Sequence, residues 1–411
     1  MGEMKEKLSA RERLEALFDA DTFVETDRLL TDAGVVTGFG YVDGTPTYAF
    51  SQDREVIGGA VGCEQALKIS RTYELAAQNG APLVGVFDSD GARLGEGTDA
   101  MDAIALILRR SQDLSGVVPQ IAVVAGACVG SAALIAASAD LVIAAEDADY
   151  YLAPGDGKGR ADLTVCCDKK AMAVARQILS YLPQNNLAAP TLFEGEDPAE
   201  AADPAGMTAD GGSLLTLSDR LAFARVDGAP VGLVTLKEDK IGAAGQVARF
   251  VRLCDSFSLP VITFLDAAGF ETLADGAKLS QAYAEVTAPK ITVITGRAYG
   301  PVYIALAGKN AGADAVLAWP GTVISPLAPE TAVELLWQDK LKAMTDPLHD
   351  RPALAAEYAA TQCDPATAAA KGILTDLTEP AATRQALIGY LNMLAGKRVT
   401  HLPRKHANLQ L

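Results

Sequence analysis

The chain has 411 residues, 49% of them hydrophobic and 21% charged, with a net charge of −17. This composition is typical of a globular protein with room for two sizeable domains, and the negative charge argues against nucleic acid or an anionic membrane surface as a partner. The six cysteines lack metal-ligand spacing, since Cys166 and Cys167 are adjacent, so we expect free thiols in a reducing compartment. Residues 1–7 lack the apolar core of a signal peptide, and we therefore expect a cytoplasmic protein.

The first predicted element is an amphipathic helix over residues 9–18. Ser9 stands at the N-cap position and Glu12 three residues later, which is the spacing of a capping box. Leu14, Leu17 and Phe18 fall on one face of this helix.

A first α/β module follows, over residues 23–154. Short β-rich runs alternate in it with helical stretches, and such alternation predicts a sheet with helices on its faces. The predicted strands are residues 47–50, 83–87, 121–125 and 141–145, and the predicted helices include residues 64–77 and 99–112.

Residues 121–139 carry no charge and could be mistaken for a membrane span. The corresponding later segment, residues 291–312, contains Arg297 and Lys309, which would be costly in lipid. We therefore predict a buried strand that runs into a buried helix in both segments.

The second half begins after a break. Residues 155–159 are rich in glycine, a helix is predicted over residues 169–182, and residues 188–212 read as an acidic, solvated linker. A second module spans residues 214–329 and is followed by helices near residues 330–344, 352–359 and 383–394. Residues 397–405 form a basic tail, which is either solvated or docks onto a partner subunit.

The two modules repeat one another. The segments YVDGTP, APLVGVFDSDG, PQIAVVAG and ADLVIA, which start at residues 41, 81, 119 and 139, return as RVDGAP, LPVITFLDAAG, PKITVITG and ADAVLA. The copies lie 170 to 184 residues further on. A repeat of this length is domain-sized, unlike the 20–50 residues of a solenoid. The sequence thus predicts two copies of one fold.

The missing residue types exclude several mechanisms. The only histidines are His349, His401 and His406, all near the C-terminus, so neither module offers a histidine base for a catalytic triad. The chain has no His/Cys cluster for zinc, no P-loop and no dinucleotide fingerprint, and we expect no metal.

Glycine turns follow the predicted strands. Residues 88–97 follow one strand of the first module, and Gly126 and Gly130 precede a helix after the next strand. A strand–glycine–helix turn directs backbone N–H groups at one point, and two adjacent turns can form an oxyanion hole that needs no side-chain base. The alternative is that these glycines only permit tight turns and close packing, but their recurrence in both modules weakens it.

These features resemble a known family. The motifs SARERLEALFD (residue 9), FSQD (50), GAR (91), SYLPQNN (180), ARFVRLCD (248), GAKL (276), AYG (298), AWP (318) and PRKH (403) are similar to those of the carboxyltransferase β subunits of biotin-dependent acyl-CoA carboxylases and decarboxylases. The resemblance covers nearly the whole chain. It implies an α/β fold of two tandem crotonase-like domains, with residues 1–187 on the acyl-CoA side, residues 188–212 as the linker and residues 213–411 on the biotin side. It also implies a dimer-based homo-oligomer, a hexamer being one form.

The resemblance also implies roles for particular residues. Catalytic donors would come from the turns at Gly130 and Ser131 and at Gly300 and Val302. Acyl-CoA would lie beside residues of the first module, namely Gly58, Gly59, Gly91, Ala92 and Arg93, and biotin beside Tyr299, Pro301 and Ile304. Biotin would arrive on a separate carrier protein, because the chain has no Met-Lys-Met signal, and a biotin carboxylase or decarboxylase subunit would complete the system.

The chain departs from the family at three places. Pro301 stands where the family has glycine, and proline lacks an N–H, although it also suits the start of a helix. The loop predicted at residues 267–275 is short, and the regions after Tyr151 and between the modules are trimmed. Ile304 stands where the family often has Asp, which either changes acyl preference or reflects core packing.

We therefore expect transfer of a carboxyl group between biotin and a short acyl-CoA. One alternative is an impaired paralogue that binds acyl-CoA or assembles with an active carboxyltransferase. Another is a biotin-independent decarboxylase or hydrolase that uses only the first oxyanion hole.

Overall fold

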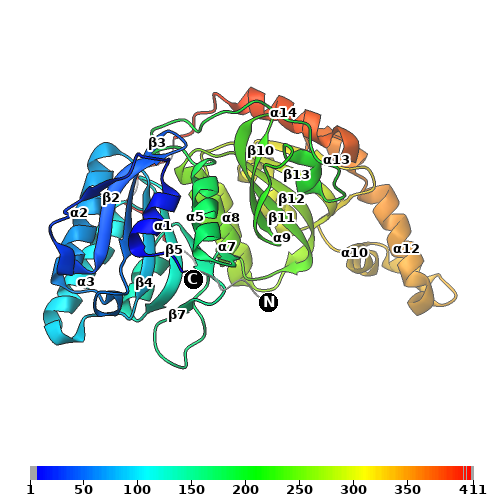
Figure 1. Cartoon of the computed structure of the whole chain (residues 1–411). Helices are drawn as coiled ribbons and strands as arrows, with labels where there is room; N and C mark the ends of the chain where they lie inside the picture. Colours follow the sequence, from blue (N-terminus) through cyan, green and yellow to red (C-terminus); the bar gives the residue numbers. More distant parts are fainter. Residues whose placement is uncertain (1–6, 401, 404, 409–411) are drawn as a thin grey trace, which may run out of the picture. The chain divides into compact units, whose positions relative to one another are not determined.

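A computed structural model describes residues 7–400, 402–403 and 405–408 of the chain. The chain forms two compact units, Met1–Thr191 and Leu192–Leu411. In Figure 1 the first is coloured blue to green and the second green to red. Residues 1–6 and, within the basic tail, His401 and Arg404 lie outside the described residues.

The first unit is built on an eight-stranded sheet of order β1-β2-β3-β4-β5-β6-β8, with β7 paired to β5. β1 to β3 are antiparallel and the pairs from β3 to β8 are parallel. The strands are β1 Val24–Thr26, β2 Val35–Val42, β3 Thr45–Gln52, β4 Leu83–Ser89, β5 Gln120–Val129, β6 Leu141–Ala145, β7 Asp149–Tyr151 and β8 Leu163–Val165.

The described helices of the first unit flank this sheet, and Figure 1 labels all of them except α4. They are α1 Ala10–Leu17, α2 Cys63–Asn79, α3 Thr98–Asp113, α4 Ser131–Ala137 and α5 Asp168–Leu179. The predicted capping box at the start of α1 is confirmed, because the Glu12 N–H donates to Ser9 and the Ser9 N–H donates to the Glu12 carboxylate. Leu14, Leu17 and Phe18 are buried, as the amphipathic pattern predicts.

The second unit repeats the plan with the order β16-β14-β13-β12-β11-β10-β9, and β15 pairs with β13. Its strands are β9 Leu215–Ser218, β10 Leu221–Val226, β11 Ala229–Ile241, β12 Val261–Phe270, β13 Lys290–Tyr299, β14 Ala315–Ala318, β15 Val323–Ser325 and β16 Asp376–Leu377. The segments expected as strand followed by helix are strand and helix in both units, and within the described residues no helix combines the length and apolar character needed to cross a membrane.

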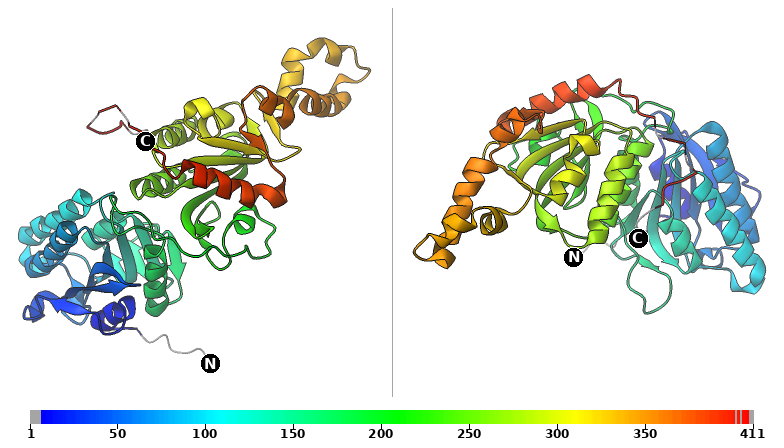
Figure 2. Two further views of the ribbon diagram at one scale, coloured as in Figure 1. Left: turned by 90° about the horizontal axis from the view of Figure 1, so that it is seen from above. Right: turned by 180° about the vertical axis from the view of Figure 1, so that it is seen from behind.

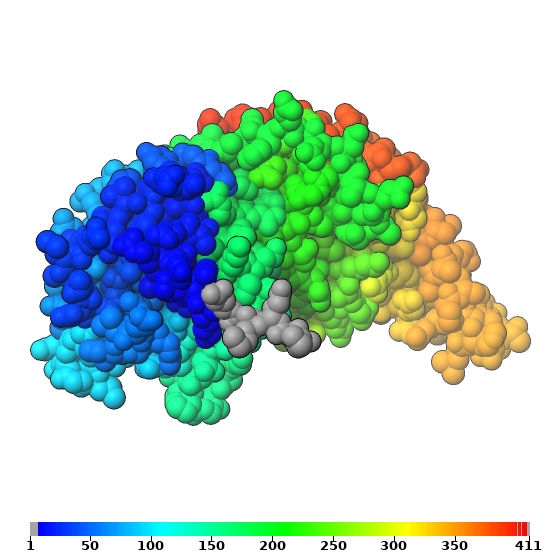
Figure 3. Space-filling view, in the orientation of Figure 1, coloured from blue at the N-terminus to red at the C-terminus, as the bar shows by residue number. Residues whose placement is uncertain are grey.

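The helices of the second unit fall into two groups. One group packs near the sheet, and the other, α10 to α12, extends away from it (Figures 1 and 2). In the space-filling view this projection appears in orange (Figure 3). The helices are α6 Pro204–Thr208, α7 Gly245–Ser256, α8 Leu273–Glu285, α9 Pro301–Leu306, α10 Pro329–Leu336, α11 Gln338–Lys342, α12 Pro347–Gln362, α13 Pro365–Ala370 and α14 Thr383–Leu394.

Two hairpins explain why the VDG motif occurs in both units. Asp43 and Gly44 join β2 to β3 with φ of 49° and 77°, and Asp227 and Gly228 join β10 to β11 with φ of 53° and 76°. An Asp-Gly pair with positive φ at both residues is the preferred two-residue turn between twisted antiparallel strands. The VDG motif is therefore repeated because both hairpins need the same backbone conformation.

Two expectations about connecting segments are wrong. Residues 267–270 do not form a loop, since β12 continues to Phe270 beside the longer β11 and α8 begins at Leu273. Within the acidic segment, Asp210 is not a solvated charge: it is 4% exposed and accepts N–H groups of Asp227 and Gly228. Its carboxylate also pairs with Arg384 at 2.8 Å.

Each sheet contains the same irregularity where its two central strands end. Phe87 and Ser89 of β4 pair with Val124 and Cys128 of β5, so three residues of β5 lie opposite Asp88. In the second unit Leu265 and Ala267 pair with Ile294 and Ala298, which leaves three residues opposite Asp266. A bulge of this kind bends the strand and redirects the chain that follows it.

Glycine is required inside both bulges. A Cβ atom added to Gly126 would lie 2.3 Å from Oδ1 of Asp88, and one added to Gly296 would lie 2.4 Å from Cγ of Asp266. These carboxylates therefore occupy the space that any side chain at the two glycines would need.

We expect Gly126→Ala to destabilise the protein by about 1–3 kcal/mol, the usual effect of overpacking a tight interior. Gly95→Ala is the matched control, because a Cβ at Gly95 meets no atom within 4 Å and its φ is not positive. Urea unfolding of the two variants measures the difference. Equal midpoints for both variants would contradict the packing argument.

Candidate active site

The first glycine turn joins β5 to α4. Gly130 has φ 60° and ψ −129°, a conformation that L side chains rarely adopt. The Gly130 N–H, expected as an oxyanion donor, donates to the Tyr151 carbonyl at 3.0 Å and is therefore occupied in this structure. The N–H groups of Ser131 and Ala132, at the start of α4, make no hydrogen bond within the described part of the chain. These free donors lie one and two residues further along the chain than Gly130.

The loop after β4 lies beside this turn. A Cβ added to Gly91 would lie 3.2 Å from the Val129 carbonyl, immediately before Gly130. Ala92 bridges to Val61, and the Arg93 N–H donates to the Val61 carbonyl at 2.9 Å. The Ala92 N–H has no acceptor among the described residues. Ala92 and Ser131 thus supply free N–H groups from two neighbouring turns, which is the arrangement of an oxyanion hole.

Gly58 and Gly59 pack against the start of the same loop. Both have positive φ, and the Asp90 N–H donates to the Gly58 carbonyl at 3.0 Å. A Cβ at Gly59 would lie 2.1 Å from the Asp88 carbonyl. The structure therefore gives these two glycines the role of close backbone packing against the end of β4.

Arg93 carries the most conspicuous polar group near this loop. Its NH1 pairs with Glu96 at 3.3 Å, but its Nε and NH2 are buried and have no hydrogen-bond partner among the described residues. A buried cationic donor without a partner costs free energy, so a ligand or another chain that accepts these hydrogen bonds would be stabilised there.

The second glycine turn joins β13 to α9. Gly300 has φ 40° and ψ −111°, and its N–H donates to the Ser325 carbonyl at 2.8 Å, so this expected donor is also occupied. Pro301 is the first residue of α9, where proline fits well. Since Pro301 has no N–H, the first free donor is Val302. The turn is the geometric counterpart of the one at Gly130, with one donor removed.

The counterpart of Ala92 was missed by sequence reasoning. This counterpart is Phe270. It pairs with Ile241, whose carbonyl accepts the Glu271 N–H, in the same way that Ala92 pairs with Val61, whose carbonyl accepts the Arg93 N–H. The repeat of Gly91 as Gly269 contained this signal, because the residue after each glycine is the equivalent position. The expectation of a short loop there concealed it.

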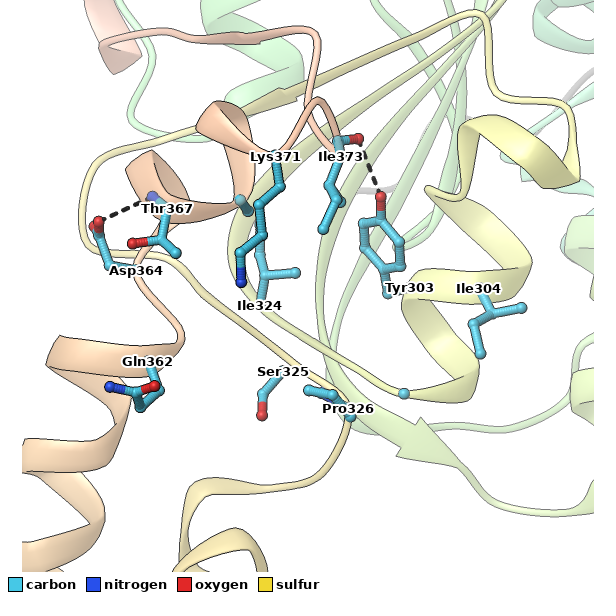
Figure 4. A pocket seen from close by; sticks show the side chains of 12 residues that line it. Tyr303, Ile304, Ile324, Ser325, Pro326, Gln362, Asp364, Thr367, Lys371 and Ile373 are labelled. Atoms are coloured by element: carbon cyan, nitrogen blue, oxygen red, sulfur yellow. Dashed lines mark hydrogen bonds between the residues drawn. The ribbon is translucent and has the colours of Figure 1, made fainter. Parts of the chain in front are cut away.

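A cavity of about 340 Å³ opens beside the second turn (Figure 4). Gly300, Tyr303 and Ile304 line one side, and residues from the end of α12 to the segment after α13 line the other. Ile304 is 63% exposed, so core packing does not explain its apolar character. The Tyr303 hydroxyl donates to the Ile373 carbonyl at 3.2 Å, and burial raises the pKa of Tyr303.

Polar groups also reach this cavity. The Lys371 side chain extends into it toward Ile324, and Ser325 and Gln362 lie at its lower end (Figure 4). Tyr299 does not line the cavity; it is partly buried in β13, and burial raises its pKa. Among the described residues, no group of three or more His, Cys, Asp or Glu side chains is arranged to hold a metal ion.

Comparison with known proteins identifies the family. Residues 3–155 and 221–409 match the carboxyl transferase domain. The chain belongs to this carboxyltransferase family. The predicted resemblance is therefore confirmed, and so is the fold of two tandem crotonase-like domains, since the chain superposes on the structure of transcarboxylase 12S with a TM-score of 0.90. That structure is 32% identical in sequence, and the match covers 98% of this chain and 93% of the other.

Among carboxyltransferases of known sequence, two relatives are similar over nearly their whole length. The carboxyltransferase subunit of propionyl-CoA carboxylase from Haloferax mediterranei is 34% identical, over 99% of this chain and 94% of the relative. Methylmalonyl-CoA decarboxylase subunit alpha from Veillonella parvula is 33% identical, over 98% and 93%. The first alignment runs over 485 positions, more than the 411 residues of this chain, so this carboxyltransferase is shorter than its relative in internal segments.

Proposed function

We propose that this carboxyltransferase moves a carboxyl group between biotin, held on a separate carrier protein, and a short acyl-CoA. The observation that carries the proposal is the pair of free N–H groups of Ala92 and Ser131, in a chain whose relatives carry the names of propionyl-CoA carboxylase and methylmalonyl-CoA decarboxylase. We propose a three- or four-carbon acyl group on this basis. At the carbon next to the thioester the reaction breaks a C–H bond and forms a C–C bond. The N–C bond of carboxybiotin breaks and the ureido nitrogen takes up the proton, or all of these changes run in reverse.

On the acyl-CoA side, the backbone donors have a defined task. Removal of the carboxyl group leaves negative charge on the thioester oxygen of an enolate, and the Ala92 and Ser131 N–H groups are placed to stabilise such an oxyanion. The unpaired nitrogens of Arg93 offer further hydrogen bonds to an anionic ligand. The first unit, with proposed boundaries at residues 1–187, holds these groups.

On the biotin side, the cavity beside Gly300 suits a small apolar ring with a polar edge. Its volume lies in the range of small-molecule sites, and Tyr303, Ile304 and Ile324 supply apolar walls. The ureido oxygen of biotin would face the turn at Gly300, Pro301 and Val302. The second unit, proposed to start at residue 213 after the 188–212 linker, therefore has an intact cavity but one donor fewer.

Pro301 favours a second candidate function. Loss of one oxyanion donor typically costs about 10²–10³ in rate, so a chain with Pro301 could bind acyl-CoA or assemble with an active carboxyltransferase while it turns over slowly. Transcarboxylase 12S, one relative of known structure, forms a hexamer assembly. We propose a homo-oligomer for this chain as well, together with biotin carrier and biotin carboxylase or decarboxylase subunits.

The deciding experiment is isotope exchange between methylmalonyl-CoA labelled in its free carboxyl group and free biotin or a biotinylated carrier. Labelled carboxybiotin is the expected product. Binding of CoA without exchange, and co-purification with an active carboxyltransferase, would favour the second candidate. Release of labelled CO₂ in the absence of biotin would instead identify a biotin-independent decarboxylase.

A further inference from the structure

The N-terminal helix contains a buried arginine that the proposed reaction does not use. Arg13 of α1 is 2% exposed. Its NH2 group donates to Oδ2 of Asp88 at 2.8 Å, and its Nε donates to Oδ2 of Asp168 at 2.9 Å. Asp88 and Asp168 are also buried, at 3% and 4% exposure. A buried ion network of this kind is costly to break, because removal of one partner leaves an uncompensated charge.

Asp88 connects this network to the first turn. Its Oδ1 accepts the Ala127 N–H at 3.1 Å, within the three residues of β5 that lie opposite it. Residues 127–129 then pair with β7 and end at Gly130 and the free N–H of Ser131. Asp88 therefore fixes the first residue of the redirected segment that leads through Gly130 to the free N–H of Ser131.

The second unit repeats the connection with a different cation. Oδ1 of Asp266 accepts the Arg297 N–H at 2.9 Å, and Arg297 is the counterpart of Ala127. The Arg297 side chain itself pairs with this carboxylate, through Nε at 2.9 Å. The same carboxylate–backbone contact is thus kept in both units, although the positive charge comes from the buried Arg13 and, at 3.4 Å, the half-exposed Arg54 in the first unit and from Arg297 in the second.

We propose that Asp88 and Asp266 are positioning residues for the two oxyanion turns, and that α1 is attached to the first unit to supply the Arg13 countercharge for Asp88. The proposal rests on the proposed function for its kinetic consequence. Asp88 does not touch the substrate. It holds the strand segment that aims the Ser131 N–H, so its loss lowers the rate of the chemical step more than it weakens acyl-CoA binding.

Asp88→Asn is the informative variant. One carboxylate oxygen, Oδ1, accepts the Ala127 N–H and lies 3.4 Å from NH1 of Arg54, and the other accepts Arg13. An Asn side chain has a single acceptor oxygen, so it loses the contacts on one of these two sides. We expect a fall in kcat of about 10- to 100-fold for carboxyl transfer from methylmalonyl-CoA to free biotin, somewhat less than for loss of a whole donor. The KM for methylmalonyl-CoA should change by less than about threefold. Backbone amides of residues 127–130, which are hydrogen-bonded in the wild type, should exchange with deuterium faster, while β4 residues before Asp88 keep their protection.

Asp168→Asn is the matched control, because it also removes a buried carboxylate from Arg13 but leaves the bond to Ala127 intact. It should lower the melting temperature to a similar extent, while kcat and hydrogen exchange at residues 127–130 stay close to wild type. If the two variants have the same kcat and the same exchange at this turn, the proposal is overturned. A wild-type protein without carboxyl transfer refutes the proposed function instead. The comparison of amide hydrogen exchange between the two variants then decides the positioning role by itself.

Discussion

Ser131→Pro is expected to lower kcat for carboxyl transfer by about 10²–10³, because it removes the N–H that we assign as an oxyanion donor. The substitution makes the first turn resemble the second. Gly300 precedes Pro301 with φ 40° and ψ −111°, and Gly130 has φ 60° and ψ −129°, so the backbone accommodates proline at this position. Proline is also favourable at the first position of a helix, and the fold should be retained.

Ser131→Ala is the control for this prediction, since it removes the hydroxyl and keeps the N–H. Steady-state kinetics should show near wild-type kcat for Ser131→Ala, and both variants should melt within a few degrees of each other. A Ser131→Pro variant with undiminished kcat would show that the enolate is stabilised elsewhere.

Pro301→Ala is the complementary experiment and should raise the transfer rate. An alanine adds the missing N–H at the start of α9 and fits the helical conformation of this position. If the second turn stabilises charge on the biotin ureido oxygen, one restored donor is worth up to about 10²–10³ in kcat. The gain should appear with free biotin and with a biotinylated carrier.

Pro329→Ala provides the matched control, because Pro329 also occupies the first turn of a helix, α10, and does not line the cavity beside Gly300. Its removal should leave transfer unchanged. A wild-type protein with negligible exchange that becomes active on Pro301→Ala would support an impaired carboxyltransferase. Equal rates for wild type and Pro301→Ala would refute a role for this N–H.

The fold was predictable because its signals are local and occur twice. The Asp-Gly hairpins, the capping box at Ser9 and the alternating β and α segments each depend on a few neighbouring residues, and the repeat allowed one unit to check the other. Pro301 at the start of α9 was predictable for the same reason. The continuation of β12 to Phe270 was not, because pairing with the extended β11 is a long-range interaction that overrides the turn signals of Gly269 and the residues after it.

The identity of the oxyanion donors was less accessible from sequence. Glycine predicts the turn, but the neighbouring strand determines which N–H stays without an acceptor. The N–H groups of Gly130 and Gly300 donate to the carbonyls of Tyr151 and Ser325 on such strands. The Arg13 network was equally hidden, since Arg13, Asp88 and Asp168 are far apart along the chain. The helix pattern placed Leu14 in the core but gave no reason to bury the arginine beside it.

The bulge opposite Asp88 also limits how the length of this segment can change. From Phe87 to Ser89 the chain advances two residues while β5 advances four, from Val124 to Cys128, and the second unit shows the same numbers. Both steps are even, so the alternation of side chains between the two faces of each strand is preserved across the irregularity. A single inserted or deleted residue would turn Cys128 out of the core and reverse the direction in which the chain enters Gly130. Length changes between Val124 and Gly130 that keep this alternation of side chains therefore come in steps of two residues.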